Sequence, residues 1–279
     1  MTPKYSKNSI PLLLERPLSP AETRSSTFQL LSQSILASSQ CDLRIFEGLN
    51  GQRDIRPIPN QRGLLAVWKR PQKGSQYVIG ADVAEGIEID GAPADDKHDY
   101  STLDVIDRNT GEQVCTFHGR LTPDEFGRQS CLIGRWYNDA FAGVENNGGY
   151  GGHVLVTMES EGYPLSQLYR DAQLRKMGWT TTRANRKSLM SNLDMSIRSR
   201  EVLINSEDTV NELKAFVTKP DGRIEAGSGR KDDRVFSLAI ANKMLEVAPP
   251  IFSDKHKDST LHYQRLNIIL SGLSGQFRK

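Results

Sequence analysis

From Gly63 onward, short apolar runs alternate with polar turns, and this pattern predicts a mixed α/β core. Strands are predicted in GLLAVWKR, QYVIGADVA, YSTLDVIDR, EQVCTFHGR and AFAGVEN. The Asn-Thr-Gly between the third and fourth of these runs favours a hairpin turn. Since short connections join antiparallel neighbours, the early strands are expected to form an antiparallel meander.

Helical spacing and capping residues predict the helices of the same region. The most complete helix start has Thr122 as N-cap, Pro123 at the first helical position and Glu125 at the third. The glycine-rich turn GGYGG is expected to enter a second helix that ends near Gly162. Further helices are predicted over residues 26–39, 187–199, 206–218 and 233–247. The last of these is expected to carry one apolar stripe: Val235, Leu238, Ala239, Asn242 and Leu245.

Composition divides the chain into three segments. Residues 1–60 are rich in Ser, Pro, Gln and Arg and, apart from the helix at 26–39, predict an extended arm or linker. Residues 61–250 are expected to form one domain and residues 251–279 a polar tail. With 279 residues, 37% of them hydrophobic, the chain is long enough for one large packed domain. No apolar run approaches the length that a membrane-spanning helix needs.

The net charge of only +2 does not by itself predict a nucleic-acid partner. Its distribution is more informative, because basic residues predominate over residues 1–75 and acidic residues over residues 82–107. An acidic centre beside basic flanks suits a metal site that acts on a polyanion, although uneven surface charge is common. The three cysteines are far apart and lack metal-binding spacing, so free thiols are expected rather than zinc ligands.

Four acidic residues are candidates for metal binding. Asp82 lies inside the apolar run YVIGADVA, where burial of its charge requires a cation or hydrogen bonds. Glu145 ends the run AGVEN, and Asp232 and Asp233 open the last helix. Mg²⁺ and Mn²⁺ bind such oxygen ligands, and two such ions can drive phosphodiester hydrolysis. Structural alternatives are a turn cap for Asp82, a surface position for Glu145, and a helix N-cap for one residue of the pair.

A basic cluster, TTTRANRKS, stands near the start of a predicted helix. Its Arg183, Arg186 and Lys187 could neutralise backbone phosphates without reading base sequence, and a solvated basic loop is an equal alternative.

The chain has no GxxxxGK[ST] phosphate loop, so GGYGG is interpreted as a tight turn. Solvated loop or strand-edge positions are expected for Asp95, Asp96, Asp104 and Asp107. The histidines His98, His118 and His153 are isolated, and a structural role is favoured for His153.

Residues from about 60 to 248 resemble the C-terminal nuclease domain of phage large terminase subunits, which package the DNA of tailed phages. The resemblance is carried, in chain order, by GLLAVWKRPQKG, YVIGADVAEG, DYSTLDVIDRNTGE, GVENNGGYG, NRKSLMSNLDMSI, EVLINSEDTVNELKAFV and EAGSGRKDDRVFSLAIA. It covers roughly two thirds of the chain and implies an RNase H-like fold, with antiparallel first strands followed by a parallel one and flanking helices. Two departures are a longer loop over residues 85–98, and Lys231 where the family often has histidine.

By position, the resemblance implies that Asp82, Glu145 and the Asp232–Asp233 pair bind two Mg²⁺ or Mn²⁺ ions and catalyse cleavage. Asp99 matches an acidic position that can assist the metal site. The implied activity is endonucleolytic cutting of double-stranded DNA with little sequence specificity, in the cytoplasm of an infected bacterium and outside the finished virion. Implied partners are an ATPase domain, to which residues 1–60 would connect, the small terminase subunit and the portal.

Three other functions share this fold class. A docking module that binds DNA or a portal without cutting would be expected to lack part of the acidic set, which is complete here. An actin-like or sugar-kinase ATPase would need two related halves with glycine-rich phosphate hairpins, and no duplication is evident. A Holliday-junction resolvase would use the same metals on a branched substrate, and only the terminase-like motifs disfavour it.

Overall fold

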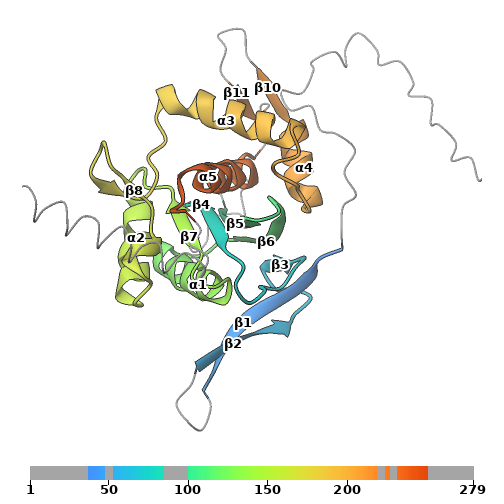
Figure 1. Ribbon diagram of the computed structural model, residues 1–279, viewed down its shortest axis with the longest axis vertical. Coiled ribbons are helices and arrows are strands. Elements are labelled where there is room, and N and C mark those ends of the chain that lie inside the picture. Colours follow the sequence, from blue (N-terminus) through green and yellow to red (C-terminus); the bar gives the residue numbers. More distant parts are fainter. Residues whose placement is uncertain (1–36, 48–52, 85–99, 219–223, 227–230, 251–279) are drawn as a thin grey trace, which may run out of the picture.

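The centre of the protein is a seven-stranded sheet, seen in a computed structural model that describes residues 37–47, 53–84, 100–218, 224–226 and 231–250 (Figure 1). The strand order is β2-β1-β3-β6-β5-β4-β7. Its strands are β1 (Ser39–Glu47), β2 (Arg53–Pro59), β3 (Leu65–Val67), β4 (Tyr77–Asp82), β5 (Ser101–Asp107), β6 (Gln113–Gly119) and β7 (Phe141–Val144). Two short ribbons lie outside this sheet: β8 (Arg170–Asp171) with β9 (Lys176–Met177), and β10 (Phe216–Thr218) with β11 (Ile224–Ala226).

The strands β4, β5 and β6 form the predicted antiparallel meander, and β7 pairs with β4 in parallel. The Asn-Thr-Gly turn joins β5 to β6 as predicted, with Gly111 at a positive φ of 69° that glycine adopts without strain. A mixed sheet whose antiparallel strands are followed by a parallel one is therefore confirmed. The parallel pairing brings the ends of β4 and β7 to the same edge of the sheet.

Helices cover both faces of the sheet (Figure 1). One face packs against α1 (Pro123–Trp136) and α2 (Tyr150–Ser160), and the other against α3 (Arg183–Arg198), α4 (Glu207–Lys214) and α5 (Asp233–Val247). A single 3₁₀ turn, η1 (Leu165–Gln167), follows α2. No helix among the described residues is both long and apolar enough to span a membrane.

The first helix begins as its sequence predicts. The Thr122 side chain accepts a hydrogen bond from the backbone N–H of Glu125, and the Glu125 carboxylate accepts one from the backbone N–H of Thr122 at 3.2 Å. This capping box satisfies two backbone donors that the first turn of a helix leaves without a partner. Phe126, Ile133 and Tyr137 are buried, which orients α1 against the sheet.

Some predicted boundaries are wrong. The predicted helix at 206–218 ends at Lys214, and Phe216–Thr218 form β10 instead. The chain from Ser39 to Pro59, inside the predicted arm, adds β1 and β2 to the sheet. The rest of the helix predicted at 26–39 and the tail at 251–279 lie outside the described residues. Short hairpins that pair with distant strands leave a weaker local signal than amphipathic helices do.

The last helix, α5, has the predicted bounds but is buried on more than one side. Every residue from Val235 to Asn242 is buried, since α5 lies between the sheet and the layer of α3 and α4. The predicted stripe is buried or half-buried, and the buried surface of α5 extends beyond it. A helix enclosed on several sides needs small or apolar residues around most of its circumference, and Ser237, Ala239 and Ala241 meet that need.

Two paired glycines allow α5 to approach the sheet closely. Gly80 of β4 and Gly143 of β7 stand opposite each other in the parallel register. A Cβ added at Gly80 would meet the backbone of Ser237 and Ala241, whereas the atoms nearest to one added at Gly143 belong to the side chain of Met244. The backbone of α5 thus rests directly on β4, which sets the distance between the start of α5 and the end of β4.

We predict that Gly80→Ala destabilises the protein by about 3 kcal/mol, because neither backbone can move away without disturbing the sheet. For a domain of this size this corresponds to a fall in melting temperature of roughly 6–12 °C. Gly143→Ala is the matched control and should cost about 1 kcal/mol or less, since a flexible methionine can shift. Thermal unfolding followed by circular dichroism measures both variants. Equal melting temperatures for the two would contradict the direct backbone contact at Gly80.

Candidate metal centre

The four predicted acids line one cavity. Asp82 from β4, Glu145 from the residue after β7, and Asp232 and Asp233 from the start of α5 surround a space of about 240 Å³. The structure therefore brings together acids that are separated by up to about 150 positions in the sequence. Three separate elements of secondary structure hold the set, so its geometry depends on the packing of the whole core.

The register between β4 and β7 places Asp82 next to Glu145. Ala81 pairs with Val144 in the parallel register, so the next residue of each strand is an acid. The backbone N–H of Glu145 donates a hydrogen bond to the carbonyl of Ala81 at 2.8 Å, which continues the pairing. Burial, and after it the neighbouring Glu145 carboxyl, raise the pKa of Asp82.

The turn after Glu145 is built from glycines for a steric reason. Gly149 has a φ of 95° and is the N-cap of α2, and a Cβ on Gly151 would collide with the carbonyl of Glu145. The interpretation of GGYGG as a tight turn is confirmed. Asn147 in this turn donates to the Glu145 carboxylate at 3.1 Å and to the Thr181 carbonyl at 2.9 Å. It therefore links Glu145 to the segment that enters α3.

The two acids of α5 have different surroundings. Asp233 is buried, and its Oδ2 accepts a hydrogen bond from the backbone N–H of Tyr100 at 3.2 Å. Asp232 is more exposed, and its Oδ2 lies 2.8 Å from Nη2 of Arg186. The N-cap residue Asp232 makes no side-chain hydrogen bond to the first turn of the helix. The structural alternative of a simple N-cap is thus not seen for Asp232.

A column of stacked side chains holds Tyr100 against this site. The Tyr100 ring stacks on His118 with centroids 4.3 Å apart, and the Arg120 guanidinium lies 4.6 Å from the centroid of the same ring. Burial and the nearby charges of Arg234, Lys231 and Arg120 lower the pKa of His118 to about 3, so this ring is neutral. His118 is therefore not isolated, and Tyr100 has a place in the site that its sequence position does not predict. The stack has no local sequence signal, since Tyr100 directly precedes β5 and His118 lies on β6.

Asp104 belongs to a buried network one turn away from Asp233. The expectation that it is solvated is wrong, because it is fully buried and accepts hydrogen bonds from Gln113, Thr116 and Ser237. Burial raises the pKa of Asp104, and these three hydrogen bonds act against that increase. Because Ser237 belongs to α5, the network fixes the rotation of this helix relative to β5 and β6.

Carboxyl groups dominate the electrostatics of the cavity. Burial, the contact with Glu145, and the charges of Asp233 and Asp232 all raise the pKa of Asp82 well above its usual range. Arg186 is the single cationic side chain among the described residues that line the cavity. Such a concentration of negative charge is unfavourable unless protons or a cation balance it.

This donor set fits hard divalent cations. Carboxylate oxygens from Asp82, Glu145, Asp232 and Asp233 are the ligands that Mg²⁺ and Mn²⁺ prefer, and no cysteine or histidine lines the cavity among the described residues. The side chains do not yet surround one point, since no group of three or more potential ligands among the described residues stands at metal-binding spacing. The Asp82–Glu145 contact and the Asp232–Arg186 pair turn these carboxyls toward protein partners.

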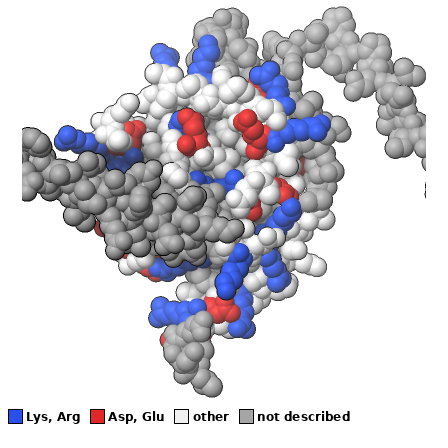
Figure 2. All heavy atoms as spheres, viewed as in Figure 1, with Lys and Arg blue, Asp and Glu red and all other residues white. Residues whose placement is uncertain are grey.

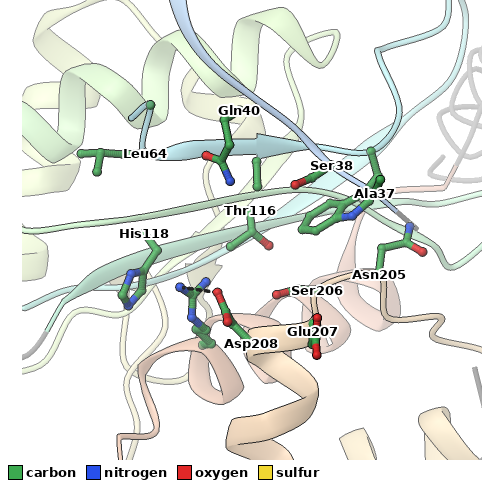
Figure 3. A pocket seen from close by; sticks show the side chains of 14 residues that line it. Ala37, Ser38, Gln40, Leu64, Thr116, His118, Asn205, Ser206, Glu207 and Asp208 are labelled. Atoms are coloured by element: carbon green, nitrogen blue, oxygen red, sulfur yellow. Dashed lines mark ion pairs between the residues drawn. The ribbon is translucent and has the colours of Figure 1, made fainter. Parts of the chain in front are cut away.

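A larger cavity of about 480 Å³ lies between β6 and the start of α4 (Figure 3). Thr116 and His118 face it from the sheet, and Ser206, Glu207 and Asp208 face it from α4. Its one described ion pair, between Arg234 and Asp208, balances a cation with an acid. Its lining therefore offers no cluster of uncompensated carboxylates, and the smaller acidic cavity is the better candidate for metal chemistry.

The predicted phosphate contacts occupy different environments at the start of α3. Arg183 and Lys187 are exposed, whereas Arg186 points into the acidic cavity. On the face shown in Figure 2, Lys and Arg side chains are interspersed with Asp and Glu rather than gathered into one basic patch.

The predicted assisting acid, Asp99, lies outside the described residues, as do Asp95, Asp96 and His98. The three cysteines are buried free thiols, as predicted.

Solved structures with a similar fold include two of the large terminase nuclease from the thermophilic phage G20c. The structure with bound magnesium is 20% identical over 66% of this chain and 89% of its own, with a TM-score of 0.53. The structure with bound cobalt is 21% identical over the same shares, with a TM-score of 0.51. No protein-family model and no curated protein matches the sequence.

These likenesses confirm the fold. The mixed sheet flanked by helices is the RNase H-like arrangement of large terminase nuclease domains, as the sequence resemblance implies. At about one identical residue in five, the similarity concerns the path of the chain and leaves the chemistry to be argued from the residues of this protein.

We predict that Asp82→Asn raises the melting temperature in EDTA by a few degrees, roughly 2–4 °C for each kcal/mol of repulsion removed. The amide keeps the size of the side chain and removes one charge from an acidic cluster. Glu159→Gln is the matched control, because it also replaces a carboxylate by an amide of the same size. Glu159 is exposed on α2, so this variant should leave the melting temperature unchanged. A clear loss of stability in Asp82→Asn would show that Asp82 is structural.

Proposed function

We propose that this protein is a metal-dependent endonuclease that cuts duplex DNA with little sequence specificity, as the nuclease part of a phage terminase large subunit. The observation that carries the proposal is the convergence of Asp82, Glu145, Asp232 and Asp233 on one cavity. The fold shared with large terminase nucleases supports it. The proposed cofactor is Mg²⁺ or Mn²⁺, with two ions in the active site, and Asp99 is proposed as a further ligand.

Each acid has a distinct task in this mechanism. Asp82 would bind metal from the end of β4, and Glu145 would bind it from the residue after the neighbouring strand β7. Asp233, oriented by the Tyr100 backbone, and Asp232 would complete the ligands from α5. The bound ions would supply the Lewis acidity that activates water and stabilises the departing oxygen. The protein contributes fixed oxygen ligands and a cavity open to the phosphodiester backbone.

The proposed substrate is double-stranded DNA, held through phosphates. Arg183 and Lys187 are exposed at the start of α3, the helix whose Arg186 lines the cavity, and they suit phosphate contacts, which carry no base information. Cutting at whatever sequence lies in the site would serve a packaging machine in the cytoplasm of an infected bacterium. The partners in that proposal are an ATPase domain, the small terminase subunit and the portal, each following from the resemblance.

We expect purified protein to linearise supercoiled plasmid when Mn²⁺ or Mg²⁺ is present and to stop when EDTA is added. Asp82→Asn and Glu145→Gln should each abolish cutting and keep a folded circular dichroism spectrum, because each removes a charged metal ligand. Glu159→Gln is the control and should cut like the wild type, since this acid is exposed on α2 away from the cavity.

The same assay separates the competing functions. A protein that binds plasmid but never cuts it would be a docking module. A protein that cleaves four-way junctions in strong preference to linear duplexes would be a resolvase, and the terminase proposal would then be wrong.

We further predict that DNA binding weakens steeply with salt on all duplex sequences alike. The logarithm of affinity should fall linearly with the logarithm of salt concentration, by about 0.9 for each phosphate neutralised. Arg183→Gln and Lys187→Gln should each lower that slope by roughly one, whereas Arg128→Gln on the opposite helix layer should not change it. Fluorescence anisotropy on several unrelated duplexes across a salt series provides the measurement. One strongly preferred sequence, or binding unaffected by salt, would contradict phosphate-dominated recognition.

A further inference from the structure

Arg186 occupies an unusual position for a residue that sequence analysis groups with surface phosphate contacts. Its Nη2 lies 2.8 Å from Asp232 Oδ2, and its guanidinium carbon lies 4.0 Å from the centroid of the Phe236 ring. It lines the acidic cavity, which its neighbours Arg183 and Lys187 do not. Arg186 therefore forms an ion pair with Asp232, a carboxylate that a divalent ion in this cavity would also bind.

The backbone at Arg186 is fixed while its side chain can reorient. Thr182 and Asn185 form a capping box that secures the first turn of α3. The side chains of Arg186 and Asp232 are 37% and 35% exposed, so the pair stands at the mouth of the cavity, where an ion pair is weak. The flat Phe236 ring supports the planar guanidinium through stacking, whichever anion the guanidinium meets.

We propose that Arg186 is a positioning residue that exchanges partners: it pairs with Asp232 until a divalent ion takes that carboxylate, and it then binds a phosphate of the substrate strand. The proposal rests on the nuclease function proposed above. Two cations cannot share the same oxygens of Asp232 without mutual repulsion, so the ion and Arg186 compete. A guanidinium released at this place matches the two oxygens of a phosphate, and both partners are charged.

Loss of the Arg186 guanidinium should change the affinity for the metal ion and the affinity for DNA in opposite directions. Removing the guanidinium frees Asp232 and removes a positive charge, so affinity for the ion alone should rise. Removing it also deletes a phosphate contact, so affinity for DNA should fall when the ion is bound. A purely structural tie between α3 and α5 would lower the melting temperature on loss and would change neither affinity in this pattern.

The experiment compares wild type, Arg186→Gln and the matched control Arg183→Gln, with folding checked by thermal unfolding. Binding of Mn²⁺ without DNA is followed by electron paramagnetic resonance of the free ion. We expect Arg186→Gln to bind Mn²⁺ about two- to fivefold more tightly, and Arg183→Gln to bind it like the wild type.

The second measurement is duplex binding by fluorescence anisotropy, once in Ca²⁺ and once in EDTA. In Ca²⁺, which binds the same type of oxygen ligand, Arg186→Gln should lose about tenfold in affinity. In EDTA the loss should be small, because Arg186 is then paired with Asp232. Arg183→Gln should lose similar affinity under both conditions. Arg186→Lys, which keeps the charge but lacks the planar fork, should recover only part of the binding in Ca²⁺.

The outcomes separate this proposal from the proposed function. If wild type neither binds Mn²⁺ nor cuts DNA, the nuclease function fails and the exchange fails with it. If wild type does both, but Arg186→Gln leaves Mn²⁺ affinity unchanged or lowers it, only the exchange is overturned. Equal loss of DNA affinity in Ca²⁺ and EDTA would also overturn it, because Arg186 would then be an ordinary phosphate contact.

Discussion

The direct contact between the backbone of α5 and β4 is the constraint on which the rest of the site depends. Gly80 leaves no side chain between the strand and Ser237 or Ala241, so the helix is held at a fixed distance from the sheet. The hydrogen bond from Ser237 to the buried Asp104 then fixes its rotation. With distance and rotation both set, the start of α5 can only project Asp232 and Asp233 toward the end of β4.

The same packing makes the site electrostatically costly, and nearby contacts offset part of that cost. The backbone N–H of Tyr100 on Asp233 and the guanidinium of Arg186 on Asp232 each compensate one carboxyl. These contacts are individually weak and replaceable, in contrast to the network around Asp104, which is buried and made entirely of protein groups. A rigid support beneath exchangeable contacts suits a site whose ligands must rearrange when a cation and a phosphate enter.

Local sequence predicts the elements and the identity of the acids, and tertiary contacts supply what it misses. The Thr122 capping box and the apolar run around Asp82 are local signals, and both are found where the sequence indicates. By contrast, Tyr100 and Asp233 are 133 residues apart, and Arg186 and Asp232 are 46 apart, so neither contact has a periodic or capping pattern. Asp104 is misassigned for the same reason: its polar partners lie on β6 and α5 and compensate a burial that composition alone disfavours.

The difference between Arg183 and Arg186 shows why a basic cluster in a sequence is not one functional unit. The two residues stand three positions apart on α3, yet Arg183 is exposed to solvent while Arg186 lies against Phe236 inside the acidic cavity. A charge in solvent contributes to DNA affinity mainly through counterion release, and this contribution depends on salt alone. A charge against Asp232 changes the energy of every cation that approaches the same carboxylate, so its contribution depends on whether metal is bound. The geometry of α3 thus couples metal binding to substrate binding through one side chain, while the adjacent arginine serves attraction to DNA alone.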